Sequence, residues 1–263
     1  MSQPLPLLWV ESDPLAAARK GAALLNQWGM EAQAQGETFM VSLAGGTTPE
    51  TLYREWGQSS RLDWSRVVLL FGDERCVEPH HPDSNHAMVA ASLFPYLPVR
   101  PQLERMEGER PPQEGAQRYD TRLAALLNGG QPWQAALLGM GADGHTASLF
   151  PHSPALAQRA RLCVEAESPA GQRHRLTLSL GALLRPRRLM VVVTGGGKAQ
   201  VLAQVLEGPW MPQELPAQFL LRPEGRTQGD GPETHLVCDA AAANELSHDF
   251  LNRHLSPPPP YSG

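Results

Sequence analysis

Short apolar runs alternate along this chain with longer segments whose apolar residues recur at helical spacing. The runs Val67–Phe71 and 189–193 contain several valines and no polar residue, which is typical of strands buried on both faces of a parallel sheet. Segments 15–34 and 113–127 have the pattern of amphipathic helices. Because strands that alternate with helices form βαβ units, we predict an α/β fold with a doubly wound, mostly parallel sheet and helices on both faces.

The same patterns give the remaining elements and the domain limits. We expect residues 1–255 to form a single domain and residues 256–263, with four consecutive prolines, to form a disordered tail. Further strands are predicted at residues 7–10, 38–43, 135–138, 162–164 and 176–180, and further helices at residues 49–56, 83–94, 198–206 and 240–251.

Composition excludes several classes of function. The net charge is −5 and no block of Lys or Arg is present, which disfavours nucleic-acid binding. No apolar run approaches the roughly 20 residues of a membrane helix, and the N-terminus lacks the features of a secretory signal. Cys76, Cys163 and Cys238 form no CxxC pair, so neither a zinc site nor a disulfide framework is predicted. We expect a cytoplasmic protein with reduced thiols, no membrane or nucleic-acid partner, and a monomeric or weakly homo-oligomeric state.

Four polar, glycine-rich segments follow predicted strands, at residues 44–49, 72–85, 139–151 and 194–198. Ligands of open parallel sheets bind beyond the carboxyl ends of the strands. We therefore expect these four segments to form one site.

Two of these segments are candidates for binding an anion. Gly45, Gly46 and Thr47 precede a predicted helix, whose N-terminal amide groups favour phosphate; an ordinary turn with a threonine cap fits equally well. Lys198 follows three glycines and suits a phosphate, although the segment is not a Walker A loop.

The segment after Val67–Phe71 combines Asp73, Glu74 and Arg75 in one turn. An arginine at the end of a strand can bind phosphate through its planar guanidinium, whereas a surface ion pair is the alternative. Arg175 is a further possible cation, or else a surface residue at the start of a strand. Three histidines of the following loop match no standard zinc spacing, so no metal is predicted: His80, His81 and His86.

Residues 139–144 match the G-x-G-x-x-G fingerprint of dinucleotide sites. That fingerprint needs a long helix after the last glycine, and Pro151 and Pro154 interrupt the segment. Asp143 precedes His145 by two residues, so its carboxylate could orient the imidazole for general-base chemistry; a structural histidine is the alternative. No G-x-S-x-G motif is present, which favours water activated by histidine over a covalent intermediate.

Taken in order, the segments resemble the 6-phosphogluconolactonase family, which is related to the glucosamine-6-phosphate isomerases and deaminases. The resemblance covers nearly the whole chain and implies a Rossmann-like, NagB-type fold. It rests on G-G-T-T-P at residues 45–49, G-D-E-R-x-V at 72–77, G-x-G-x-D-G-H-x-A-S-L-F-P at 139–151, R-x-T-L at 175–178 and G-G-x-K at 195–198.

The resemblance implies hydrolysis of 6-phospho-D-glucono-1,5-lactone in the oxidative pentose phosphate pathway, with a small-molecule substrate, no organic cofactor and no metal. It implies that His145 is the general base, that Asp143 orients it, and that Asp73 has an electrostatic or water-positioning role. We expect the backbone N–H groups of residues 141–144 to stabilise the oxyanion. The implied phosphate-binding residues are Gly45, Gly46, Thr47, Arg75, Lys198 and Arg175.

Three alternatives remain open. The isomerases and deaminases have D-E-Y where this chain has Asp73, Glu74 and Arg75, and a glutamate where it has Phe150, which argues against ring-opening chemistry. A non-catalytic sugar-phosphate sensor of the same fold is the second alternative, and an NAD(P)-binding protein is the third.

Overall fold

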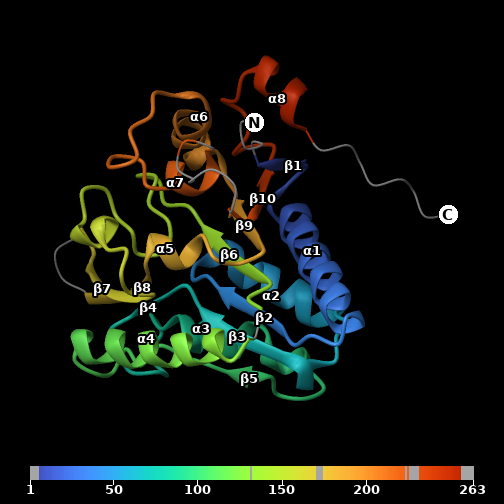
Figure 1. Cartoon of the computed structure of the whole chain (residues 1–263). Helices are drawn as coiled ribbons and strands as arrows, with labels where there is room; N and C mark the ends of the chain where they lie inside the picture. The colour runs from blue at the N-terminus through green and yellow to red at the C-terminus, as the bar shows by residue number, and fades with distance from the viewer. Residues whose placement is uncertain (1–5, 131, 170–173, 223, 225–230, 256–263) are drawn as a thin grey trace.

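A seven-stranded sheet forms the centre of the molecule (Figure 1). The computed structural model describes residues 6–130, 132–169, 174–222, 224 and 231–255. All neighbouring strands of this sheet are parallel, which confirms the predicted α/β class. In spatial order the strands are β1 (Leu7–Glu11), β10 (Glu233–Asp239), β9 (Arg188–Val193), β6 (Ala135–Gly139), β2 (Phe39–Leu43), β3 (Val67–Phe71) and β5 (Gln102–Leu103).

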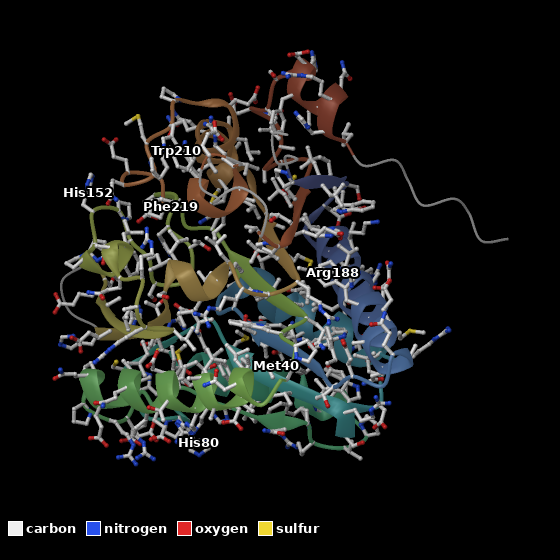
Figure 2. The ribbon with its side chains drawn as sticks, in the orientation of Figure 1. Met40, His80, His152, Arg188, Trp210 and Phe219 are labelled. Atoms are coloured by element: carbon white, nitrogen blue, oxygen red, sulfur yellow. The ribbon has the colours of Figure 1, made fainter. Side chains whose placement is uncertain are left out.

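The central strands are buried along their whole length, which explains their continuous apolar sequence. Every residue of β2 and β3 is buried, and Met40, labelled in Figure 2, is only 1% exposed. Truncating a large side chain in these strands to alanine should cost about 2–5 kcal/mol, because the neighbouring layers cannot close the cavity.

The winding of the chain reverses between β2 and β6. From β2 the chain continues to β3 and β5 on one side, then returns to β6 on the other side and proceeds to β9 and β10. With right-handed connections, the helices before β5 cover one face and those after it cover the other. Consistent with this, α1 contacts α2 and α2 contacts α3, while α6 contacts α7. The helices are α1 (Pro14–Ala34), α2 (Thr47–Ser59), α3 (Asn85–Ser92), α4 (Pro112–Asn128), α5 (Leu180–Leu183), α6 (Ala199–Glu207), α7 (Gln218–Leu221) and α8 (His248–His254).

A second, three-stranded sheet lies outside the main one. It consists of β4 (Asp73–Arg75), β8 (His174–Leu178) and β7 (Cys163–Glu167), all antiparallel, with α4 packed along it. The two segments predicted as strands at 162–164 and 176–180 therefore form a hairpin and not part of the parallel sheet. The connection between them is too short for a parallel crossover, which needs a dozen or more residues.

The C-terminal region differs most from the sequence prediction. The strand β10 is not predicted, and the predicted helix 240–251 is wrong over residues 240–246, which form turns. The buried Asp239 carboxylate accepts the N–H of Ala242 at 2.8 Å and so holds the chain in a turn. Ser247 then caps α8 by accepting the N–H of Phe250. The predicted tail 256–263 lies outside the described residues.

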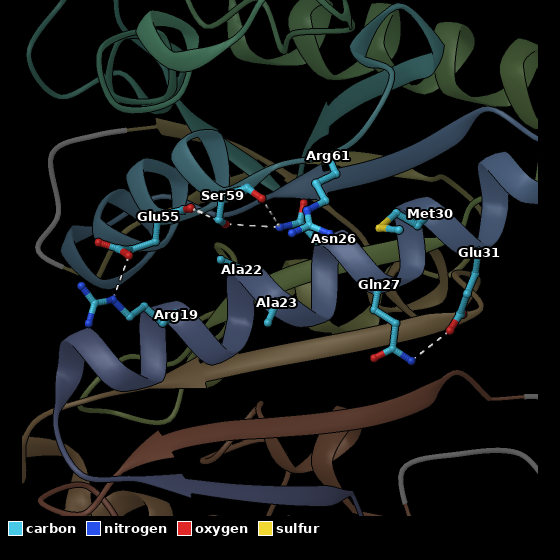
Figure 3. Close-up of a pocket in the computed structure, with 10 residues that line it drawn as sticks. All are labelled: Arg19, Ala22, Ala23, Asn26, Gln27, Met30, Glu31, Glu55, Ser59 and Arg61. Carbon is cyan, nitrogen blue, oxygen red and sulfur yellow. Dashed lines mark hydrogen bonds and ion pairs between the residues drawn. The ribbon is translucent and has the colours of Figure 1, made fainter. Parts of the chain in front are cut away.

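A surface pocket of 710 Å³ opens between α1 and α2 (Figure 3). An ion pair between Arg19 and Glu55 and hydrogen bonds from Asn26 to Ser59 join the two helices around it. None of the predicted site residues lines this pocket. Across the described ranges, no helix is long and apolar enough to cross a membrane.

His235 on β10 is a buried polar residue that ties α1 to the sheet edge. Its side chain is 5% exposed, and its ring lies edge-on to Trp28 at 4.9 Å. The indole N–H of Trp9 donates to Nδ1 at 3.4 Å, so Nε2 carries the proton and donates to Glu233 at 2.7 Å. Burial lowers the pKa of His235, although Glu233 acts in the opposite direction.

We predict that His235 makes the fold less stable in acid. Because its folded-state pKa lies below that of the unfolded chain, its contribution is fully present above about pH 6.5 and is lost as the pH falls through the folded-state pKa. Urea unfolding at about pH 7.5 and about pH 5.5 should show a larger loss of stability in the wild type than in His235→Gln. Equal losses in both proteins would contradict this.

Candidate active site

A cavity of 340 Å³ lies at the carboxyl ends of β2, β3, β6 and β9, across the point where the winding reverses. This is where open parallel sheets bind ligands. All four glycine-rich segments contribute to it. The lining consists of residues 44–49, Asp73, Arg75, residues 139–141, His145, Ala147, residues 192–194 and Lys198.

Asp143 and His145 form a close pair at this cavity. Asp143 Oδ1 lies 2.5 Å from His145 Nδ1 and also accepts the His145 backbone N–H at 3.2 Å. Burial acts to raise the pKa of Asp143, but the charge and the hydrogen bonds of His145 hold that pKa below its ordinary value. Asp143 is therefore ionised near neutral pH and favours the tautomer with a proton on Nδ1, which leaves Nε2 as the proton acceptor.

The turn that carries this pair depends on Gly141. A Cβ atom at Gly141 would lie 2.0 Å from His145 Nδ1 and 2.5 Å from Asp143 Oδ1. The Gly141 N–H donates to the His145 carbonyl, and the Gly144 N–H donates to the Gly141 carbonyl. These two amide groups are therefore occupied within the turn, which corrects the expectation that the 141–144 amides as a group stabilise an oxyanion.

Phe150 packs against the imidazole from the same segment. Its ring centroid lies 4.7 Å from that of His145, and the residue is 7% exposed. Ala147, which stands between these two residues in the sequence, lines the cavity. Its φ of 48° is left-handed, a conformation that is costly for a residue with a Cβ. The backbone here is held in an unfavourable conformation beside the site.

The three charged side chains of strand β4 point alternately to opposite sides of the strand. Successive side chains of a strand point to opposite sides, so Asp73 and Arg75 reach the cavity while Glu74 points to α3. The Glu74 carboxylate accepts the backbone N–H groups of Asn85 at 2.7 Å and His86 at 2.8 Å, and thus caps that helix. Burial raises the pKa of Glu74, while these hydrogen bonds act to lower it.

Two neutral side chains hold the Asp73 carboxylate at the cavity. Asn85 Nδ2 donates to Oδ1 at 3.0 Å, and Ser148 Oγ donates to Oδ2 at 2.7 Å. Neither is predicted as a site residue from sequence patterns. The signal for Ser148 is its place in the motif at residues 139–151, and that for Asn85 is its place in the polar segment 72–85. Neither pattern shows the contact with Asp73, which in the case of Ser148 joins residues 75 positions apart.

The two cations of the cavity are held by carbonyl groups. Arg75 Nη1 donates to the Asp83 carbonyl at 2.7 Å, and Lys198 Nζ donates to the Met140 carbonyl at 2.9 Å. A carbonyl fixes a cation without neutralising its charge. Burial lowers the pKa of Lys198, although Asp143 acts to raise it.

The N-terminus of α2 completes this end of the cavity. Gly46 is the N-cap of α2 and has a φ of 106°. The first amide groups of this helix, which have no partner inside the helix, belong to segment 44–49, which lines the cavity. The hydroxyls of Thr48 and Thr194 lie 2.7 Å apart and join this loop to the loop after β9. Together with Arg75 and Lys198, the helix end suits a phosphate group.

Two predicted site residues do not line the cavity. Asp143 reaches it only through its contact with His145, and Arg175 is the one predicted phosphate-binding residue outside the lining. Arg175 on β8 is paired directly with Arg75 on the neighbouring strand β4. Its proposed contact with phosphate stays a prediction.

The metal and dinucleotide alternatives find little support in the geometry. His80 is exposed and lies at the periphery (Figure 2). Among the residues that the structure describes, no three His, Cys, Asp or Glu side chains are grouped as metal ligands. No long helix follows Gly144: the chain forms a tight turn and then a 3-10 helix at Pro154–Ala157.

Comparisons with known proteins agree on one family. The family model described as glucosamine-6-phosphate isomerases/6-phosphogluconolactonase matches residues 12–228. A 6-phosphogluconolactonase of Treponema pallidum is 35% identical over 195 residues, covering 72% of this chain and 81% of that protein. One from Aggregatibacter actinomycetemcomitans is 31% identical over 210 residues, covering 78% and 87%. The crystal structure of a 6-phosphogluconolactonase from Shewanella baltica has a TM-score of 0.79 at 26% identity, covering 91% of this chain and all of that one.

We predict that Gly141→Ala displaces the imidazole, because its Cβ would overlap His145 and Asp143. The matched control is Gly139→Ala, whose Cβ meets no atom within 4 Å. In NMR spectra of the ring nitrogens, the His145 signals should move in Gly141→Ala and stay in place in Gly139→Ala. Unmoved signals in a folded Gly141→Ala protein would refute the close approach.

Proposed function

Since the chain belongs to the family of glucosamine-6-phosphate isomerases and 6-phosphogluconolactonases, we propose that it hydrolyses 6-phospho-D-glucono-1,5-lactone to 6-phosphogluconate, a step of the oxidative pentose phosphate pathway. The observation that carries this proposal is the shared cavity: the His145 ring, oriented by Asp143, and the cations Arg75 and Lys198 line one space. The named relatives at 31–35% identity support the choice of substrate.

The phosphate of the substrate binds at the cationic end of the cavity. Arg75 offers a planar pair of donors, Lys198 a point charge, and Thr47 stands at the start of α2 where the amide groups are free. Gly45 and Gly46 let the backbone approach the anion closely. Anchoring the phosphate fixes the lactone in the cavity, which removes part of the entropic barrier.

His145 then acts as the general base. Nε2 takes a proton from water as the water oxygen attacks C1 of the lactone. The imidazolium then gives that proton to the oxygen of the lactone ring as the bond between C1 and this oxygen breaks. Asp143 stabilises the imidazolium that forms in between. The Asp73 carboxylate, held by Asn85 and Ser148, offers a fixed acceptor for the hydroxyl groups of the sugar or for the attacking water.

Phe150 favours the lactonase over the isomerase or deaminase reaction within this family. The related isomerases and deaminases have a glutamate at this position, which adjusts the proton affinity of the catalytic histidine. Here an apolar ring lies 4.7 Å from the imidazole. No carboxylate from this position can therefore move a proton during ring opening.

We predict that His145→Gln lowers kcat by about 10²–10⁴-fold with little change in KM, because general-base catalysis contributes about that much. The control His81→Gln, an exposed histidine outside the cavity, should keep wild-type kcat. Hydrolysis of 6-phosphogluconolactone is measured by product formation. A normal kcat in His145→Gln would refute the assignment of the base.

The wild type should prefer 6-phosphogluconolactone over unphosphorylated gluconolactone by about 10²-fold or more in kcat/KM, because only the former uses the phosphate anchor. Release of ammonia from glucosamine 6-phosphate, without lactone hydrolysis, would assign the chain to the other branch of its family.

The lowered pKa of Lys198 predicts how binding depends on pH. The ammonium loses its proton below the ordinary value of about 10.5, so affinity for 6-phosphogluconate should fall in mildly alkaline solution. Lys198→Arg keeps its charge over this range and should bind with little pH dependence. Calorimetric titrations between about pH 7 and about pH 10 measure both curves. Parallel curves would rule out Lys198 as the titrating contact.

A further inference from the structure

Asp239 is a buried carboxylate that the proposed reaction does not use. It is the last residue of β10 and is 1% exposed. Glu107, which is 8% exposed, is paired with three arginines, Arg110, Arg118 and Arg122. Among the described residues, by contrast, no basic side chain forms an ion pair with Asp239. A buried charge without an ionic partner is expensive, so its hydrogen bonds must carry its compensation.

Those hydrogen bonds come from two turns. The Gly195 N–H donates to both carboxylate oxygens, at 3.0 Å and 3.1 Å, and the Ala242 N–H donates to Oδ1 at 2.8 Å. Gly195 opens the glycine turn after β9, whereas Ala242 belongs to the turn after β10. Asp239 therefore fastens the 195–198 turn to the neighbouring strand.

This fastening matters because the turn consists of three glycines followed by Lys198. Glycines have wide conformational freedom, so the sequence of the turn does not fix its own shape. Gly195 has a φ of 89°, its carbonyl accepts the Lys198 backbone N–H at 3.0 Å, and Lys198 Nζ then reaches the Met140 carbonyl. The position of the ammonium thus depends on a turn that is held at its first residue by Asp239.

We infer that Asp239 is a positioning residue for phosphate recognition: it holds the 195–198 turn so that Lys198 is preset for the phosphate of the substrate. The inference rests on the proposed function for the identity of the anion. Asp239 does not line the cavity, and it acts through Gly195 and Lys198. Its effect falls mainly on the phosphate end, because Asp239 bonds the 195–198 turn directly. His145 is carried by another loop, residues 139–149, which this turn contacts through Lys198 and the Met140 carbonyl.

The test compares Asp239→Asn with a matched control, Asp120→Asn. Asp120 is a partly buried carboxylate that accepts the N–H groups of Leu162 and Cys163 at 2.6 Å and 3.2 Å and does not line the cavity. Each variant loses a carboxylate charge that accepts backbone N–H groups, but only Asp239 is bonded to the turn that carries Lys198. Their melting temperatures measure the purely structural cost.

Asp239→Asn should raise KM for 6-phosphogluconolactone about tenfold and keep kcat within about twofold, because a charge-assisted hydrogen bond that fixes the cation is lost. Its kcat/KM for unphosphorylated gluconolactone should stay at the wild-type value. Asp120→Asn should change neither. An unchanged KM in Asp239→Asn, or equal losses for both lactones, would overturn the inference.

A second variant and a binding measurement complete the test. If Asp239→Asn does not fold, Gly195→Ala perturbs the same turn at the residue whose N–H binds Asp239, since a φ of 89° is unfavourable for alanine. It should give the same selective rise in KM. Calorimetric binding of 6-phosphogluconate separates the inference from the proposed function. A wild type without lactonase activity that still binds this anion more tightly than Asp239→Asn contradicts the function and supports the role of Asp239. A wild type that neither hydrolyses the lactone nor binds the anion contradicts both.

Discussion

The reversal of winding between β2 and β6 is the constraint on which the site depends. It brings four loops, from distant parts of the sequence, to one edge of the sheet. Three hydrogen bonds then lock the loops together: Thr48 with Thr194, Lys198 with Met140, and Ser148 with Asp73. The sheet fixes the starting points of the loops, and the short loops bring an imidazole and two cations to one small cavity.

The charges of the site are held mainly by neutral partners. Arg75 and Lys198 donate to carbonyl groups, Asp73 accepts from an amide and a hydroxyl, and Asp239 accepts from backbone N–H groups. Such partners fix a charged group without cancelling its charge, which leaves the cations available for an anionic ligand. Asp143 and His145 are the exception, because their mutual attraction sets the tautomer of the ring.

Local patterns predict the parallel sheet and the four loops well, because a fully buried strand such as Val67–Phe71 needs a continuous apolar run. They fail where long-range partners decide. After the exposed Glu233, strand β10 continues with the polar residues Thr234 and His235, which become buried only between β1 and β9. The alanine-rich stretch after Asp239 turns because a buried carboxylate holds it. In the same way, the sequence motifs give Asp143, His145, Arg75 and Lys198 as candidates, whereas the supporting residues Asn85 and Ser148 become visible only once the loops meet.

A crystal structure of the wild type with bound 6-phosphogluconate would show both ends of the proposed site at once, because the product carries both the phosphate and C1. We expect the phosphate between Arg75, Lys198 and the N-terminus of α2, with the C1 carboxylate beside Nε2 of His145. A product bound with its phosphate at His145, or outside this cavity, would contradict this placement.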